Sequence, residues 1–427
     1  MMNPDNPAIQ STGQSEPNSL FDVVIVGGGM VGASLSLLLE PYLQKGLSVA
    51  LVDAQVISNK SVSSANLQQP SFDERTTALS LGSKRILDKL NVWPSLLGSA
   101  TTIEHIQVSQ QKQFGRVRLH ANESQVEALG YVVENKAIGL ALQTGLLNQK
   151  QLTIFSSAKV KHYTMVSNGV QLSLDNNDAA TSDIIQCKLL VLADGASSEG
   201  CKQLGIAQTR YDYQQHAVVC NVSFDQDHKQ WAYERFTEEG PLALLPMSQN
   251  RFALVWCMDS ESAKRRLALG ETEFKAELQK MVSFDKGRIL KVGELSSYPL
   301  SLVQANEQVR QHVAVLGNAA HALHPVAGQG FNLALRDARA LAENIGSQWQ
   351  DAGNLWGLQQ YLTDQTQDQA RTTFISHALP TNFSKGGLNW SILRALSMTL
   401  MDVLPASKQL FANQAMGLVG KSKAWRP

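Results

Sequence analysis

The 427-residue chain has few cysteines, no excess of charge and no long apolar run. Its four cysteines are scattered and form no C-x-x-C pair, so disulfide and metal sites are weakly supported and a reducing cytoplasm fits best. The 37 basic and 37 acidic residues cancel, which gives no electrostatic reason to expect nucleic acid or an anionic membrane as the main partner. Without an apolar run of roughly 18–20 residues, no membrane-spanning helix is expected.

The first residues also lack the pattern of a secretory signal. Residues 1–19 are polar and rich in Asn, Pro, Ser and Gln, which predicts a disordered tail. The hydrophobic content of 43% is typical of globular proteins. The length allows two or three structural units around substantial cores.

A β-α-β unit follows the tail. Residues 21–26 form a short apolar run that ends at glycines, which indicates a buried parallel strand. A helix is expected from Met30 to Glu40, stopped by Pro41. Residues 47–53 predict the second strand.

The turn inside this unit reads Gly27-x-Gly29-x-x-Gly32. Gly27 permits a tight turn, Gly29 lets the backbone approach a pyrophosphate, and Gly32 permits close helix–strand packing. The helix N-terminus offers unpaired N–H groups and a positive dipole end to phosphates. Asp53, about 20 residues after Gly32, can accept hydrogen bonds from ribose hydroxyls. The turn predicts dinucleotide binding, with a merely glycine-rich turn as the alternative, and by itself it leaves NAD and FAD open.

Two later segments carry a family resemblance. Asp194-Gly195 follows a predicted strand at 187–193, and residues 317–332 lie between a predicted strand at 312–316 and a helix at about 330–346. This order resembles the flavoprotein aromatic hydroxylases, the family that includes para-hydroxybenzoate hydroxylase. The resemblance implies FAD. The alternatives are a turn acid for Asp194 and an ordinary strand-to-helix turn for the later segment.

The second of these segments departs from the family at one position. Gly317 is followed by Asn318, where the family usually has an aspartate that contacts the ribityl chain. An amide can still accept a hydrogen bond from a ribityl hydroxyl. Gly328 and Gly330 flank Gln329 at the start of the predicted helix, where backbone N–H groups can face an electron-rich flavin edge. Cofactor contact is also expected at Asn332.

The resemblance extends beyond the cofactor segments. It is strongest to the ubiquinone-biosynthesis hydroxylases of the 2-octaprenyl-6-methoxyphenol hydroxylase type, at residues 72–79, 129–135, 234–237 and 240–247. It implies a monooxygenase in which NADH or NADPH, bound transiently, reduces the flavin, and O₂ then hydroxylates a polyprenylated phenol. No residue is assigned as a general acid or base.

Several single residues have two interpretations. By the resemblance, Arg75 would approach the flavin or its pyrophosphate, and the alternative is an Arg at a helix start that pairs with Asp73 or Glu74. Pro325 would contribute a backbone carbonyl beside the flavin, and the alternative is a plain turn proline. A metal site at His321 and His324 is disfavoured, since no carboxylate or cysteine completes a set nearby in sequence.

The pattern of elements predicts an α/β fold, with a Rossmann-like FAD-binding domain, an inserted mixed-sheet substrate domain and a helical C-terminus. Helix is also expected at about 74–98, and a loop at 58–72. Leu388, Ile392, Leu396, Leu400 and Leu404 mark one helix face. The expected segments are 20–205 (FAD-binding domain, with some strands of the substrate domain), 206–300 (substrate domain, with a charged helical insert at 260–282), 301–347 (FAD-binding domain) and 348–427 (C-terminal helices).

The aromatic residues of the strand-rich segment could line an apolar pocket or form sheet core, and core is the favoured interpretation for each. They are Trp231, Phe236, Phe252 and Trp256. For the C-terminal helices, core packing is weighed against contact with a copy of the chain or a biosynthetic complex and against peripheral contact with the inner membrane.

Two other functions compete with hydroxylation. A prenyl reductase or halogenase would use the same fold, although the W-x-W signature of the halogenases is missing from the sequence. A flavoprotein could also act as a non-catalytic scaffold in a biosynthetic complex. Intact glycine motifs argue against lost cofactor binding, but not against lost turnover.

Overall fold

The structure is a computed structural model. It describes residues 19–57, 75–113, 115–176, 183–282, 286–325, 328–383, 402 and 404–418. Residues 1–18 of the predicted tail, the predicted loop at 58–72 and the leucine-rich face from Leu388 to Leu400 lie outside the described residues. Ser19, placed in the tail by the sequence pattern, is the first residue of strand β1.

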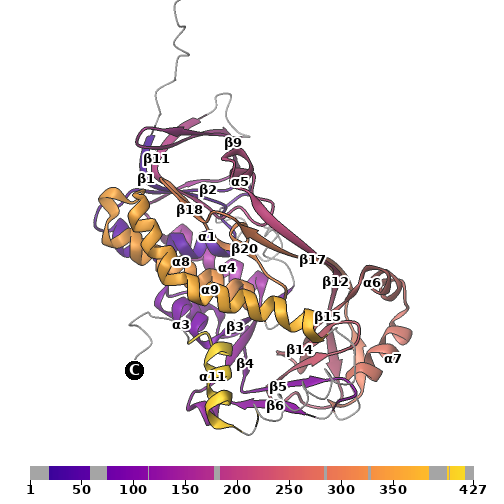
Figure 1. Cartoon of the computed structure of the whole chain (residues 1–427). Helices are drawn as coiled ribbons and strands as arrows, with labels where there is room; N and C mark the ends of the chain where they lie inside the picture. Colours follow the sequence, from indigo (N-terminus) through magenta and orange to yellow (C-terminus); the bar gives the residue numbers. More distant parts are fainter. Residues whose placement is uncertain are drawn as a thin grey trace, which may run out of the picture.

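The first sheet is built on five parallel strands in the order β19-β11-β1-β2-β8, with β18 (Val309–Arg310) antiparallel at one edge. Helices cover a face of this sheet (Figure 1). Its central strands are continuous apolar runs because both faces are buried. A hairpin of β9 (Ala158–Val166) and β10 (Gly169–Asn176) extends from β11. The five parallel strands are β1 (Ser19–Val26), β2 (Val49–Val52), β8 (Leu152–Phe155), β11 (Asp183–Leu192) and β19 (Val313–Val315).

The predicted β-α-β unit is confirmed, with one correction at its helix. Helix α1 (Met30–Leu38) ends before Pro41, so Pro41 does not stop it. Pro41 lies instead in the first turn of a second short helix, α2 (Glu40–Leu43). Proline is tolerated there because the first N–H groups of a helix have no partner within the helix.

The prediction of helix at about 74–98 is wrong in its first part. Residues Thr76–Ser80 form strand β3, which pairs with β7 (Gly130–Glu134), and β7 also pairs with β4 (Thr101–Ile103). Helix α3 (Leu81–Lys89) follows directly, and the Ser80 hydroxyl accepts a hydrogen bond from the Ser83 N–H at its start. Pairing with a strand about 50 residues away overrides the local helical pattern.

The second sheet has the order β20-β17-β12-β15-β14-β13-β5-β6, with β16 paired to β12. Strands β5 and β6, from early in the chain, complete a sheet otherwise made of residues after 207 (Figure 1). The predicted charged insert forms α6 (Ser260–Leu267) and α7 (Glu271–Val282). The strands are β5 (His105–Gln110), β6 (Arg116–His120), β12 (Gln208–Phe224), β13 (Trp231–Phe236), β14 (Pro241–Met247), β15 (Arg251–Asp259), β16 (Ile289–Val292), β17 (Ser296–Ala305) and β20 (His321–Ala322).

Helices packed on one another complete the part of the fold that carries the site. Helix α8 (Gln329–Ser347) packs on α1, and α9 (Leu355–Phe383) packs on α8 (Figure 1). Helix α1 also packs on α4 (Asn135–Asn148). Helices α9 and α11 (Pro405–Ala415) confirm the helical C-terminus, and the alternation of strands and helices confirms the α/β fold class, while the predicted domain boundaries stay a prediction. Within the described ranges, no helix combines the length and the apolarity needed to span a bilayer.

Candidate functional site

One cavity of about 1370 Å³ connects the two sheets. Small-molecule pockets usually measure roughly 300–1,000 Å³, so this cavity has room for two ligands. We call the part near β1, β2, α1 and α8 the dinucleotide end. The other part, called the sheet end, is the cavity-facing side of the second sheet, and includes Val219, Glu234, Ala243, Ala253 and Val255.

The structure brings the predicted cofactor residues together around the dinucleotide end. Gly32 and Gly317 are the two that do not line the cavity. An added Cβ at Gly317 would lie 3.2 Å from the Val31 side chain, so this glycine serves close packing. The lining residues are Gly27, Gly29, Asp53, Arg75, Asp194, Gly195, Asn318, Gly328, Gln329, Gly330 and Asn332, with Pro325.

The glycine turn has the geometry that its motif predicts. Gly27 has a φ of +105°, a conformation that favours glycine. A Cβ on Gly32 would lie 1.9 Å from the Gly27 carbonyl oxygen, so only glycine lets α1 approach the strand. Gly29 is the N-cap of α1 and supplies no side-chain cap, so the first N–H groups of the helix are available to an anion.

Asp53 holds this turn from the end of β2. Its buried carboxylate accepts a hydrogen bond from the Gly28 N–H and another, of 2.6 Å, from the Gln55 N–H. A carboxylate has about four acceptor positions, so it can still accept from a ribose hydroxyl. Asp53 therefore both shapes the turn and faces the cavity.

Asp194 leaves a polar atom in the wall of the cavity. Its Oδ2 accepts a hydrogen bond of 3.2 Å from the Gly200 N–H, whereas its Oδ1 is buried with no hydrogen-bond partner in the described part of the chain. Burial raises the pKa of the Asp194 carboxyl, partly offset by hydrogen bonds. An orphaned acceptor of this kind fits a ligand hydroxyl.

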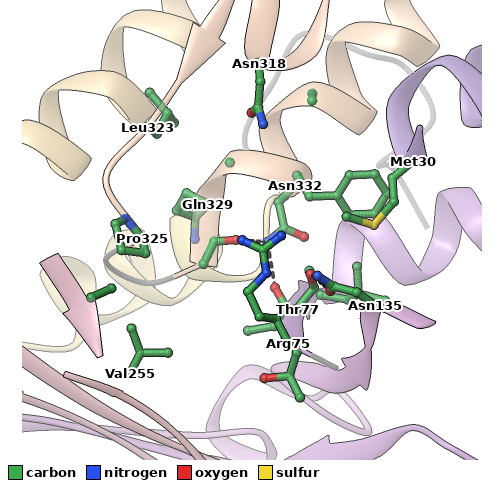
Figure 2. Close-up of a pocket in the computed structure, with 18 of the residues that line it drawn as sticks. Met30, Arg75, Thr77, Asn135, Val255, Asn318, Leu323, Pro325, Gln329 and Asn332 are labelled. Carbon is green, nitrogen blue, oxygen red and sulfur yellow. Dashed lines mark hydrogen bonds between the residues drawn. The ribbon is translucent and has the colours of Figure 1, made fainter. Parts of the chain in front are cut away.

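The start of α8 forms the opposite wall. Gly328, with a φ of +59°, is the N-cap and provides no side-chain cap to the first turn of α8, whose residues Gln329 and Gly330 line the cavity. Asn318 is exposed and extends toward the cavity from above (Figure 2). The Pro325 carbonyl already accepts a hydrogen bond of 3.0 Å from the Gly328 N–H.

Asn332 has a different place in the site. Its buried amide accepts hydrogen bonds from Ser80 N–H (2.8 Å) and the Ser83 hydroxyl (2.7 Å). It donates to the carbonyls of Ala78 and Gly328, both at 2.8 Å. All these bonds lie within the protein, so the side chain ties β3 and the start of α3 to Gly328 at the start of α8 and positions the cavity wall.

Arg75 extends into the middle of the cavity (Figure 2). Its guanidinium carbon lies 4.6 Å from the ring centre of Tyr298, which is cation–π distance. Because Arg75 directly precedes β3, it is not a helix-start residue, so that part of the alternative is wrong, whereas the pairing stays a prediction. Its suggested partners Asp73 and Glu74 lie outside the described residues.

Sequence reasoning assigned no role to several lining residues. The Thr77 hydroxyl donates a hydrogen bond of 2.6 Å to the Asn135 side-chain oxygen, and both residues line the cavity. Both lie within the segments that carry the family resemblance, which was the available signal. Tyr298 and Glu234 also line the cavity and had no predicted role.

The sheet end is mostly aliphatic. Of the four aromatic residues considered for a pocket, Phe236 lines the cavity. Trp256 and Phe252 are buried core, as favoured, and Trp231 packs 4.8 Å from the His105 ring.

The two histidines considered for a metal point to different neighbours. His321 Nε2 lies 3.5 Å from the Asp337 Oδ2, a carboxylate that is close in space but not in sequence. The ring of His324 lies 4.9 Å from that of Tyr213, and burial, with neighbouring His377, lowers the His324 pKa to about 4. Within the described residues, no group of three or more His, Cys, Asp or Glu side chains is placed to hold a metal ion.

Comparisons with known proteins agree with this geometry. The sequence model of the FAD binding domain family matches residues 21–373. Ubiquinone hydroxylase UbiL of Rhodospirillum rubrum is 32% identical over 419 residues, 97% of this chain and 93% of the relative. The human ubiquinone biosynthesis monooxygenase COQ6 is 26% identical over 92% of each chain. The crystal structure of p-nitrophenol 4-monooxygenase PnpA from Pseudomonas putida superposes with a TM-score of 0.73, at 16% identity, over 95% of this chain and 99% of that one.

FAD fits the residues present. The uncapped starts of α1 and α8, the orphaned Asp194 oxygen and the size of the cavity suit a long ligand with a pyrophosphate and several hydroxyls. The family model matches most of the chain, and one relative is 32% identical over 97% of it. Together with the fit of the site residues to FAD, these matches show that the chain belongs to the FAD-dependent monooxygenases of the FAD binding domain family.

Proposed function

We propose that the protein hydroxylates the aromatic ring of a polyprenylated phenol in ubiquinone biosynthesis, with O₂ and NAD(P)H as co-substrates. The observation that carries the proposal is the continuous cavity that runs from the predicted FAD-binding residues to a largely aliphatic sheet face. The names of the relatives UbiL and COQ6 support the ubiquinone pathway. A polyprenylated phenol is largely apolar, so burial of its apolar surface against an aliphatic wall would drive its binding.

The residues of the dinucleotide end would hold the cofactor. The start of α1 with Gly29 would bind the pyrophosphate, Asp53 a ribose hydroxyl, and Asp194 a hydroxyl of the chain that joins the pyrophosphate to the flavin. Arg75 would contact the flavin or a phosphate oxygen. Bound FAD, once reduced by NAD(P)H, supplies the activation of O₂.

The sheet end would bind the phenol ring and exclude water. Val219, Ala243 and Val255 present aliphatic side chains to the cavity. An apolar wall keeps water from the reacting atoms and strengthens each electrostatic interaction near them. The Pro325 turn would lie beside the flavin, contributing backbone rather than a titratable group.

Peripheral contact with a membrane is part of this proposal. Helices α9 and α11 expose Phe374 (69%) and Leu410 (71%), and Leu404 before α11 is also exposed. A membrane-embedded substrate would favour such contact. Co-sedimentation with lipid vesicles tests it, and a stable oligomer that does not sediment with lipid would indicate a subunit interface instead.

The test of the function is a product analysis. The purified yellow protein is supplied with NADH or NADPH and a short-chain prenyl phenol, and the mass of the product is measured by mass spectrometry. We expect phenol-dependent reductant oxidation and a product heavier by one oxygen atom. A product with two added hydrogens or a halogen would support the reductase or halogenase alternative. If the protein consumes no reductant and forms no product, the non-catalytic scaffold alternative is supported.

A further inference from the structure

The cavity has to accept more than FAD and a phenol ring. Its volume is about 1370 Å³, whereas a pocket for one small molecule usually measures roughly 300–1,000 Å³. A cofactor and a ring therefore fill most of it, so a tail of several isoprene units has to follow one of the walls and leave. The side chains of the described walls indicate which way the tail runs.

The wall at β12 and β16 is polar. Asn221 and Ser223 of β12 line the cavity there. In the strand register, Ser223 lies between Arg251 of β15 and Lys291 of β16, and both of these cations line the cavity too. An apolar tail that left on this side would desolvate charged groups without satisfying them, which costs free energy.

The wall formed by α9 also contains bonded polar groups. Thr372 and Ile375 line the cavity from this helix. The Thr372 hydroxyl accepts a hydrogen bond of 3.4 Å from Arg336, whose guanidinium forms a buried ion pair of 2.6 Å with Asp368. Parting these groups to admit a tail would leave buried polar atoms without partners.

The wall toward β5 and β6 is aliphatic. Leu245 of β14, Ala232 of β13 and Ile106 of β5 line the cavity and belong to one hydrophobic cluster. We call these three residues the aliphatic row. Leu245 and Ile106 are half-buried, so they keep surface that a ligand can cover, and Ala232, on the strand between them, has the smallest side chain of the three. Glu234 lies two positions along β13, about 7 Å from Ala232 and outside the row.

The aliphatic row leads to α11. Ile106 pairs with Leu119 of β6, the edge strand of this sheet. Helix α11 lies beside this edge (Figure 1), where Lys408 forms an ion pair of 2.8 Å with Glu123. Phe411, one turn after Lys408, lines the cavity, and it packs on the same hydrophobic core as Ile106.

Helix α11 lies between the cavity and the surface. Phe411, Gln414 and Ala415 line the cavity and are half-buried. Leu410 on the same helix is 71% exposed, and Leu404 just before the helix is 46% exposed. A single helix therefore separates the cavity from exposed leucines that suit an apolar phase.

We propose that the isoprenoid tail of the substrate lies along the aliphatic row and passes Phe411 toward the surface at α11. This inference rests on the proposed function and assigns the part of the site that recognises the tail. Neighbouring strands lie about 4.8 Å apart, so the path from β14 to β6 spans about 14 Å. An extended isoprene unit is about 5 Å long, so roughly three units cover the path. Burial of their apolar surface favours binding.

The first experiment compares phenols with one and with three isoprene units, using the FAD-loaded protein. In the wild type, KM should be at least about tenfold lower for the farnesyl phenol than for the dimethylallyl phenol. Ala232→Leu puts a larger side chain into the aliphatic row. It should raise KM for the farnesyl phenol about tenfold, and for the dimethylallyl phenol less than about twofold.

Val219→Leu is the matched control. Val219 lines the same cavity, but it belongs to β12, which lies on the other side of β15 from the aliphatic row. Its substitution should change KM for both phenols by the same factor. The inference is overturned if Ala232→Leu also changes both KM values by the same factor.

A second experiment does not depend on turnover. The probe is a farnesol analogue that has no phenol ring and carries a diazirine on its last isoprene unit. It is irradiated with the holoenzyme, and the labelled peptides are identified by mass spectrometry. We expect the label in β6 or α11, and less of it when farnesyl phenol competes. Label confined to α9 or to β12 and β16, or no label at all, would contradict the inference.

Folding and tail binding have separate readouts. FAD content should be the same in the wild type and in both variants. If Ala232→Leu loses FAD, Ile106→Thr keeps a β-branched side chain in β5 and places a hydroxyl in the aliphatic row. It should raise KM for the farnesyl phenol alone. If the wild type hydroxylates no phenol, the proposed function fails, whereas the cross-linking still decides whether the row binds a tail.

Discussion

The two ends of the cavity are built in different ways. At the dinucleotide end, short segments present backbone N–H groups, glycines and a few carboxylates, as at Gly29 and Asp194. At the sheet end, single side chains from many strands, such as Val219, Ala243 and Val255, combine into one largely aliphatic surface. A cofactor shared by many proteins can be held by a local motif, whereas a particular substrate is bound by a surface assembled over long range.

The largest expected effect comes from Gly32→Ala. Its Cβ would lie 1.9 Å from the Gly27 carbonyl oxygen, a backbone atom that cannot move aside cheaply. We expect a destabilisation of more than about 4 kcal/mol, with loss of FAD, measured by thermal unfolding and flavin absorbance. Gly98→Ala is the control, because a Cβ there meets nothing within 4 Å. Normal stability of Gly32→Ala would contradict the close packing of α1 on β1.

Gly29→Val should separate cofactor binding from folding. Gly29 lines the cavity at the start of α1, so a branched side chain would block the approach of the pyrophosphate. We expect a folded, colourless protein whose FAD affinity is at least about 1,000-fold weaker, or about 4 kcal/mol. A variant that purifies with full FAD would refute the assignment of the dinucleotide end.

The turn between the two ends should make stability depend on pH. His324 is buried with a pKa of about 4 in the folded protein, whereas an unfolded histidine titrates near 6.5. The unfolded chain binds more protons between these values, so the free energy of unfolding should fall as the pH falls from about 6.5 to about 4. The full contribution is on the order of 3 kcal/mol.

Denaturant titrations at several pH values measure this effect. His324→Asn should lose part of the acid sensitivity of the wild type, while His162→Asn at an exposed position should keep it. Equal dependence of the free energy of unfolding on pH in the wild type and His324→Asn would show that His324 is not the source of the acid sensitivity.

The smallest expected effect belongs to the sheet end. Val255→Phe fills part of the cavity wall without touching the glycine motifs. We expect kcat/KM for a prenyl phenol to fall about tenfold, or about 1.4 kcal/mol, while FAD content stays unchanged. Leu97→Phe, at a site that is 64% exposed, is the control. Loss of FAD in Val255→Phe would show that the two ends are not independent.

The sequence by itself determined the dinucleotide end. Gly27, Gly29 and Gly32, with Asp53 about 20 residues on, follow from the local geometry of a strand, a tight turn and a helix. The family resemblance then placed Asp194 and the Gly317–Asn332 segment in the same site. These features were predictable because each depends on contacts within a few residues or on a motif of fixed order.

The tertiary structure decided the rest. Pairing of β3 with β7 replaced a predicted helix, and strands β5 and β6 joined a sheet formed more than 100 residues later. These pairings bring Thr77 to Asn135 and set Val108 beside Glu234. Local patterns do not encode which distant strand becomes a neighbour, because that choice depends on how the whole chain buries its apolar faces.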